Sequence, residues 1–337
     1  MAKLVGFDIG ENSVKMVYFS GRDLKKAVSV ELPDNMVSGE RILSMDAMAD
    51  FIKSMAKANG IPLSDAGFVL GSDECFTRMV TVPVMTEQQL IYNLPYEFHD
   101  FLTEEKKNYF FDYSMQDIIN DDNGNPDKME LFACAILKRL VEDYRGMFRR
   151  AGLKLKMLTP TESAYSALLR FHATKFDRTE TDRCIVNLGH HSTNLHIYQD
   201  AKFDSRREID VGGAELDRLI GEHYGVDVHV AHSYKMNNYE DVLSSNYALE
   251  LYSRVATEII RAVNFYNYNN RERDLRDIYL CGGGAGIEPL RGTIADMTKL
   301  NIHSADDLLP QKCRIGESGL YLRAIACVFE SFAGGKK

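Results

Sequence analysis

A sequence pattern that occurs twice constrains the fold of this chain more than any other feature. The first copy reads LVGFDIGENSVKMVY over residues 4–18, and the second reads CIVNLGHHSTNLHIY over residues 184–198. Each copy predicts an apolar strand, a tight turn at a glycine and a second strand with alternating apolar positions. The copies align without a gap, so that Asp8 matches Asn187, Gly10 matches Gly189 and Ser13 matches Ser192. Two matching hairpins indicate a duplicated α/β fold, with two ordinary hairpins as the alternative.

The two turns carry residues that suit a bound polyphosphate. Backbone N–H groups of such turns can form an anion nest, so that two of them could hold phosphates from both sides. Asp8 precedes the first turn and could hold Mg²⁺ through water, because Mg²⁺ gives up its waters reluctantly. Lys15 follows the turn and could neutralise phosphate charge as a compact cation. A capped turn with a surface lysine is the alternative interpretation.

Two later glycine motifs join a strand to a helix. Gly212-Gly213 follows a strand and opens a helix, which exposes N-terminal donors to an anion, although a simple turn explains it equally well. The run Gly282–Gly286 also follows a strand. Its contiguous glycines do not match a Rossmann fingerprint, and no Walker lysine follows. A flat glycine platform for an adenine ring fits these residues better.

Composition limits the class of protein. The chain has 337 residues, of which 45% are hydrophobic, and this length predicts a large core and about two domains. No apolar run approaches the ~18 residues of a membrane-spanning helix, and a strand at the N-terminus predicts no signal peptide. The six cysteines lack Cys-x-x-Cys spacing, which favours reduced thiols in a cytoplasmic protein. A net charge of −9 argues against a nucleic-acid partner.

The order of elements predicts two domains and an insert. Pro83 ends the first strand pattern, and an aromatic-rich segment follows, with a hairpin turn at Asp121–Asp127 and a helix that ends at Gly152. The charged residues 173–182 predict a linker. The first expected domain comprises residues 1–82, 153–175 and 316–337, and its last helix spans about 316–332. The inserted subdomain comprises residues 83–152, and the second domain comprises residues 176–315.

Taken in order, these motifs resemble the actin, sugar-kinase and heat-shock-chaperone ATPase superfamily, and within it the PilM family of type IV pilus assembly proteins. The turn Asp8–Lys15, the position of the insert after Pro83, the helix motif EIIRAVNFY at residues 258–266 and the chain length carry this resemblance. It implies an actin-like (ribonuclease-H-like) duplicated two-domain fold with a small inserted α+β subdomain. It also implies ATP and Mg²⁺ as cofactors, with Asp8 at the metal.

The resemblance extends to particular residues. The first turn would bind the phosphates and the metal from one side. The second turn would bind the phosphates from the other side, with Asn187 in place of the usual aspartate. The nucleoside would lie against the remaining residues. Glu258 and Arg261 have a second interpretation, a surface ion pair at i,i+3 spacing. The implied nucleotide-binding residues are Asp8, Gly10, Glu11, Asn12, Ser13, Lys15, Asn187, Gly189, Thr193, Asn194, Gly212, Gly213, Glu215, Glu258, Arg261, Gly282, Gly283, Gly284 and Ala285.

The expected function is that of an ATP-binding cytoplasmic scaffold. By the same resemblance, such a protein binds the cytoplasmic N-terminal tail of a PilN-like inner-membrane protein, which recruits it to the membrane, and it can form a homo-oligomer or filament. The aromatic-rich residues 92–113 could supply apolar pockets for the peptide or simply form a small core. Because Asn187 lacks the carboxylate, we expect at most a slow ATPase and assign no catalytic residue. The alternatives are an FtsA-like division filament protein and a small-molecule kinase. The tail at residues 329–337 is too short for a separate membrane anchor.

Overall fold

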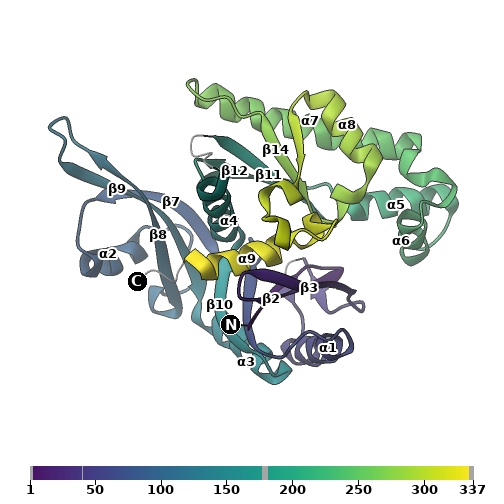
Figure 1. Cartoon of the computed structure of the whole chain (residues 1–337), viewed down its shortest axis with the longest axis horizontal. Helices are drawn as coiled ribbons and strands as arrows, with labels where there is room; N and C mark the ends of the chain where they lie inside the picture. The colour runs from purple at the N-terminus through teal and green to yellow at the C-terminus, as the bar shows by residue number, and fades with distance from the viewer. Residues whose placement is uncertain (1–2, 40, 177–180, 334–337) are drawn as a thin grey trace. The chain divides into compact units, whose positions relative to one another are not determined.

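Both copies of the repeat fold into the same three-stranded antiparallel element (Figure 1). In each copy, apolar residues at alternate positions cover one face of the sheet, so the register cannot slip without exposing them. The register pairs Asp8 with Lys15 in the first copy and Asn187 with Asn194 in the second. The strands are β1 (Lys3–Ile9), β2 (Ser13–Ser20) and β3 (Asp23–Glu31), and then β11 (Asp182–Leu188), β12 (Thr193–Gln199) and β13 (Lys202–Ile209).

The computed structural model describes residues 3–39, 41–176 and 181–333. The chain separates into unit 1 (Met1–Tyr165 with Arg323–Lys337) and unit 2 (Ser166–Leu322). These junctions differ from the predicted ones at 175/176 and 315/316, because the chain passes from one unit to the other within helix α4 (Thr161–Phe176) and at the start of α9 (Leu322–Ala333). Parts of the predicted linker (177–180) and of the predicted tail (334–337) lie outside the described residues.

The sheets of the two units share one strand order. Unit 1 has the order β10-β6-β1-β2-β3, and unit 2 has β15-β14-β11-β12-β13. In each sheet the first three strands of that order are parallel, and their carboxyl ends meet at one edge, where α/β proteins bind ligands. The added strands are β6 (Asp65–Leu70), β10 (Lys154–Pro160), β14 (Asp277–Cys281) and β15 (Asn301–Ser304). The predicted duplicated α/β fold is therefore confirmed.

Helix α9 packs directly onto the sheet of unit 1 because two strand positions are glycine. A Cβ atom at Gly6 would lie 2.3 Å from the carbonyl oxygen of Ala324, and one at Gly67 would lie 2.9 Å from the Cys327 sulfur. A short 3₁₀ turn at Ser318–Tyr321 precedes α9, so the helix begins later than the predicted residue 316. The side chains of α9 cross β1 and β6, and its first turn reaches the carboxyl edge of the sheet.

The other helices of the two units follow the amphipathic pattern of their sequences. In unit 1, α1 (Met45–Ala58) packs beside α3 (Lys138–Ala151), and a small hairpin, β4 (Val37–Ser38) with β5 (Arg41–Ile42), precedes α1. In unit 2, α7 packs beside α8, and α5 packs beside α6. The helices of unit 2 are α5 (Gly213–Tyr224), α6 (Val228–Met236), α7 (Asn246–Asn269) and α8 (Glu288–Thr298).

The inserted subdomain differs from the prediction at both ends. Its sheet has the order β7-β9-β8 and begins at β7 (Phe76–Pro83), because this strand, which the prediction assigned to the first domain, pairs with β9 from Phe76 to Pro83. Helix α3, predicted inside the insert, instead buries Tyr144 and Phe148 against Phe68 of the first core. The remaining elements are α2 (Glu87–Asn93), β8 (Tyr109–Asn120) and β9 (Pro126–Leu137).

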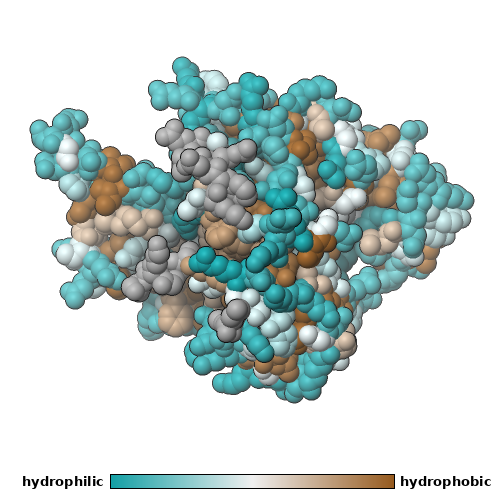
Figure 2. Space-filling view, viewed as in Figure 1, coloured by the Kyte–Doolittle hydropathy of each residue, from teal (hydrophilic) through white to brown (hydrophobic). Residues whose placement is uncertain are grey.

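The insert has a core of its own and leaves other apolar side chains at its surface. Phe98 and Tyr109 are buried in that core, whereas Tyr92, Tyr96 and Phe101 are exposed. Figure 2 shows apolar residues gathered next to the polar tip of the β8–β9 hairpin, where Met115, Ile118 and Ile119 are exposed. The predicted aromatic segment therefore serves partly as core and partly as surface.

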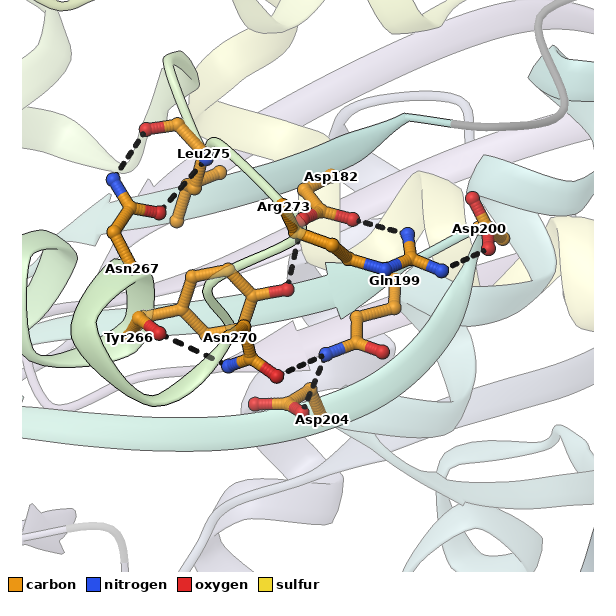
Figure 3. Close-up of polar contacts among 9 residues, drawn as sticks. All are labelled: Asp182, Gln199, Asp200, Asp204, Tyr266, Asn267, Asn270, Arg273 and Leu275. Carbon is orange, nitrogen blue, oxygen red and sulfur yellow. Dashed lines mark hydrogen bonds and ion pairs between the residues drawn. The ribbon is translucent and has the colours of Figure 1, made fainter.

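A polar network fastens the start of β11 to the end of α7 (Figure 3). Arg273 donates to the buried Asp182 at 2.7 Å and to Asp200 at 2.9 Å, and the Tyr266 hydroxyl donates to Asp182 at 2.9 Å. Gln199 donates to the side-chain oxygens of Asp204 and Asn270. Because β11 ends at the second glycine turn, this network holds the strand that positions that turn.

Candidate functional site

The two glycine turns are closed in the same way. In the first, the Gly10 N–H donates to the Ser13 carbonyl at 3.0 Å, and in the second, the Gly189 N–H donates to the Ser192 carbonyl, also at 3.0 Å. The repeat is thus a repeat of turn geometry as well as of sequence. The candidate residues form two groups, one in each unit, and each group is described on its own.

The first turn surrounds Asp8 with cations. Asp8 is 4% exposed, and Nη1 of Arg323 lies 3.1 Å from its Oδ1 atom. Nη2 of Arg323 donates to the Leu70 carbonyl at 3.3 Å, so the guanidinium spans two strand ends. Lys15 is the register partner of Asp8 across the hairpin. Burial lowers the pKa of Lys15, an effect that the Asp8 charge partly offsets and Arg323 reinforces.

These neighbours bear on the predicted magnesium site. A carboxylate that holds Mg²⁺, directly or through water, must offer negative charge that is not already neutralised. Asp8 instead faces one guanidinium and one ammonium group, whose charges together exceed its own. The donor set of the first turn, as folded here, therefore does not fit Mg²⁺ as the sequence predicted.

The other predicted residues of the first turn support its backbone. Glu11 accepts a hydrogen bond from the Gly39 N–H at 3.3 Å, and the Asn12 carbonyl accepts one from the Leu32 N–H at 2.9 Å. The Ser13 carbonyl closes the turn on Gly10. A Cβ atom at Gly10 would lie 3.3 Å from Nζ of Lys15, so glycine leaves room for the ammonium group.

The Gly212-Gly213 turn is bonded to the second glycine turn. The Gly213 N–H donates to the Gly189 carbonyl at 3.0 Å, and a Cβ atom at Gly212 would lie 2.4 Å from the His190 carbonyl oxygen. Buried Thr193 donates its hydroxyl to the Val211 carbonyl at 2.9 Å. Asn194 donates to the Ser192 hydroxyl at 2.9 Å. The structure thus brings these predicted residues of unit 2 into one connected loop cluster.

A buried ion pair, which sequence reasoning missed, lies under this cluster. Nζ of Lys235, on α6, donates to Asp217 at 2.7 Å and to the Gly213 carbonyl at 3.0 Å, and both side chains are buried. His232 lies 3.1 Å from the same Asp217 oxygen. Burial, and then the Lys235 charge, lowers the pKa of His190 to about 4. Nothing in the local sequence marks Lys235 or Asp217, because α5 and α6 bring them together.

The triple-glycine turn packs on the end of β11. Gly282 has a φ of +84°, and a Cβ atom there would lie 2.5 Å from Oδ1 of Asn187, so only glycine fits. A Cβ atom at Gly284 would lie 2.8 Å from the Leu188 side chain, whereas one at Gly283 would meet open space. Ala285 packs against the core of unit 2. Asn187 and the glycine run are therefore neighbours.

An open pocket of about 520 Å³ lies beside the Gly212-Gly213 turn in unit 2. Two predicted residues, Glu258 and Arg261, line it and form an ion pair with each other. Glu215 binds Arg218, which lowers the pKa of Glu215. The pocket is lined by Asp210, Val211, Glu250, Ser253, Arg254, Thr257, Glu258 and Arg261.

Comparison with known proteins gives a family and a fold. A family model described as type IV pilus assembly protein PilM matches residues 6–315. The solved "PilM-PilN type IV pilus biogenesis complex" aligns with a TM-score of 0.79 at 17% identity, over 97% of this chain and 98% of that one. Ethanolamine utilization protein EutJ from Carboxydothermus hydrogenoformans aligns at 0.60 and 11% identity, over 98% and 90% of the two chains.

A third solved structure, MreB 5 of Spiroplasma citri bound to AMPPNP, aligns with a TM-score of 0.54 at 13% identity, over 99% of this chain and 97% of that one. A search of curated proteins gave no match. In the part of the chain that the structure describes, no helix has the length and apolar character needed to cross a membrane.

Proposed function

Since this chain belongs to the PilM family of type IV pilus assembly proteins, we propose that it is a nucleotide-binding scaffold of a pilus or related secretion machine. The observation that carries the nucleotide proposal is the pair of glycine turns closed by the same hydrogen bond. Lys15 adds a cation at the first turn, and the pocket beside Gly212-Gly213 has room for a nucleoside. The MreB 5 neighbour was solved with a triphosphate analogue, which supports ATP as the ligand.

The proposed ligand is held rather than turned over. Phosphoryl transfer depends on charges that position the attacking water. At the position aligned with Asp8, unit 2 has Asn187, whose amide oxygen packs against Gly282 and accepts from the Cys281 thiol. We therefore expect ATP turnover below about 1 per second, the lower end of ordinary enzyme rates.

The proposed partner is the cytoplasmic N-terminal tail of a PilN-like membrane protein, which would recruit the chain to the inner membrane face. The solved neighbour in complex with PilN supports this choice. We place the contact on the exposed aromatic residues of the insert, of which Tyr92 is 72% and Tyr96 is 57% exposed. Aromatic side chains of this kind recur at protein interfaces, because they bury a large area with few rotatable bonds.

Calorimetric titration tests both parts of the proposal. For the nucleotide, we expect micromolar binding of ATP and at least about tenfold weaker binding of adenosine, which lacks the phosphates. Absence of heat with ATP would refute nucleotide binding.

For the partner, the titrant is a synthetic peptide of the PilN-type tail, with a scrambled peptide as its control. The double variant Y92S/Y96S should weaken the peptide at least about tenfold. The matched control is Tyr268→Ser, a residue of unit 2 that is 71% exposed. Equal binding by the double variant and the control would refute the placement on the insert.

A further inference from the structure

The first glycine turn contains a cation that neither the repeat nor the family resemblance requires. Arg323 lies far from the turn in the sequence, on the first turn of α9, yet its guanidinium lies 3.1 Å from the buried Asp8 carboxylate. The side chain of Arg323 is only 15% exposed. The residue of unit 2 that aligns with Asp8 is Asn187, so a guanidinium at that position would meet no carboxylate.

The fold fixes the position of this guanidinium. Helix α9 cannot shift along the sheet without a clash, since the glycines at positions 6 and 67 admit its backbone and side chains at close range. Nη2 of Arg323 also donates to the Leu70 carbonyl, which accepts the Thr161 hydroxyl at 3.2 Å as well. The guanidinium is thus preorganised at the carboxyl edge of the parallel strands.

Lys15 contributes a second cation to the same turn. Among residues 3–39, 41–176 and 181–333, it has no hydrogen-bonding or ion-pairing partner, and its ammonium group lies over Gly10. Burial lowers the pKa of Lys15, and the charge of Asp8 offsets this effect only in part. The turn therefore places two basic side chains, Arg323 and Lys15, beside Asp8, while its second acid, Glu11, accepts the Gly39 N–H. A phosphate group could pair with these two basic side chains.

We propose that Arg323 takes the place of a divalent cation at the first turn, so that Arg323 and Lys15 together bind the phosphates and ATP binds without Mg²⁺. Asp8 then orients the guanidinium rather than a hydrated metal ion. Arginine suits this role because it stays charged and matches phosphate geometry with a rigid fork of donors. The inference rests on the proposed nucleotide binding and adds that this binding does not require a metal ion.

The test is calorimetric titration with ATP in two buffers of equal ionic strength, one with Mg²⁺ and one with EDTA. For the wild-type chain we expect dissociation constants within about threefold of each other. For Arg323→Gln we expect a loss of roughly 10- to 100-fold in EDTA, because a charged hydrogen bond is removed. In Mg²⁺ the loss should be less than about fivefold, since the released Asp8 carboxylate can then recruit the metal.

Three further variants complete the design. Arg323→Lys keeps a positive charge and should retain ATP binding in EDTA. It replaces Arg323→Gln in the test if the glutamine variant does not fold. The double variant D8N/R323Q should lose the benefit of Mg²⁺, because the Asp8 carboxylate that would recruit the metal is absent. Arg145→Gln, which breaks an exposed arginine–carboxylate pair on α3, is the matched control and should change neither constant.

The outcomes separate the two proposals. Wild-type binding that EDTA weakens more than about tenfold would overturn the role of Arg323 while leaving nucleotide binding intact. An equal loss for Arg323→Gln in both buffers would also overturn it, because the arginine would then only support the fold of the turn. No binding in either buffer would refute the proposed function itself and this inference with it.

Discussion

Removal of one partner of the buried Lys235–Asp217 pair should be among the most destabilising single changes in unit 2. The two charged atoms lie 2.7 Å apart, and the side chains are 9% and 1% exposed. Removal of one partner leaves the other side chain buried without its counter-charge, whether it stays ionised or becomes neutral. For pairs of this kind the cost is about 3–5 kcal/mol.

The two partners should not be equally costly to remove. After Lys235→Met, Asp217 keeps His232 at 3.1 Å as a hydrogen-bond partner but loses its buried cation. After Asp217→Asn, Lys235 keeps the Gly213 carbonyl and can shed its proton, because burial already lowers its pKa. We therefore expect the unfolding free energy to fall by about 4 kcal/mol for Lys235→Met and by about 3 kcal/mol for Asp217→Asn.

A double-mutant cycle measured by urea unfolding and circular dichroism isolates the interaction. The variant K235M/D217N should be more stable than the sum of the single losses predicts, by about 2 kcal/mol, because no buried charge is left alone. Lys25→Met, which breaks an exposed pair with Asp23, is the matched control and should cost less than about 1 kcal/mol. A coupling energy below about 0.5 kcal/mol, or single losses no larger than that of the control, would refute the reasoning.

Three further predictions concern other parts of the chain. His190 has a pKa near 4 in the folded state and a reference value of 6.5, so between these pH values the unfolded chain binds a proton that the folded chain does not. The unfolding free energy should therefore fall by about 1–3 kcal/mol as the pH decreases from 6.5 to 4. Urea titrations should show a smaller fall for His190→Asn. Gly6→Ala should cost about 3 kcal/mol or more in denaturant unfolding, because of its contact with Ala324, whereas Gly146→Ala, whose Cβ meets open space in α3, should not destabilise. Arg273→Met should lower the unfolding free energy by about 2–4 kcal/mol by leaving Asp182 buried without its cation, and an unchanged midpoint would contradict this.

The repeat could be predicted from the sequence because its signals are local. A period of two, a glycine at the turn and a following apolar strand determine a hairpin through neighbouring residues alone, and the two copies share that pattern. The same holds for the Gly212-Gly213 and Gly282–Gly286 turns, where close approach of backbone to backbone requires glycine. The duplicated fold and the family resemblance follow from these local patterns taken in order.

The boundaries of the insert could not be predicted in the same way. Contiguity in the sequence assigned α3 to the insert, although its apolar face packs beside α1 and against Phe68, which lie far away in the chain. Pro83 does end strand β7, as predicted, but the prediction assigned this strand to the first domain, whereas it pairs with β9 of the insert. Both errors concern partners across the fold rather than preferences along the chain.

By itself, the sequence determined the two hairpin turns, the Gly282–Gly286 turn and the amide of Asn187 at the position aligned with Asp8, since each depends on residue type within a short window. Only the tertiary structure decided which charges meet. Arg323 reaches Asp8 because α9 packs over Gly6, and Lys235 reaches Asp217 because α6 packs beside α5. Charge–charge contacts act over a few ångströms in space, and the packing of helices on sheets, not distance along the chain, sets those few ångströms.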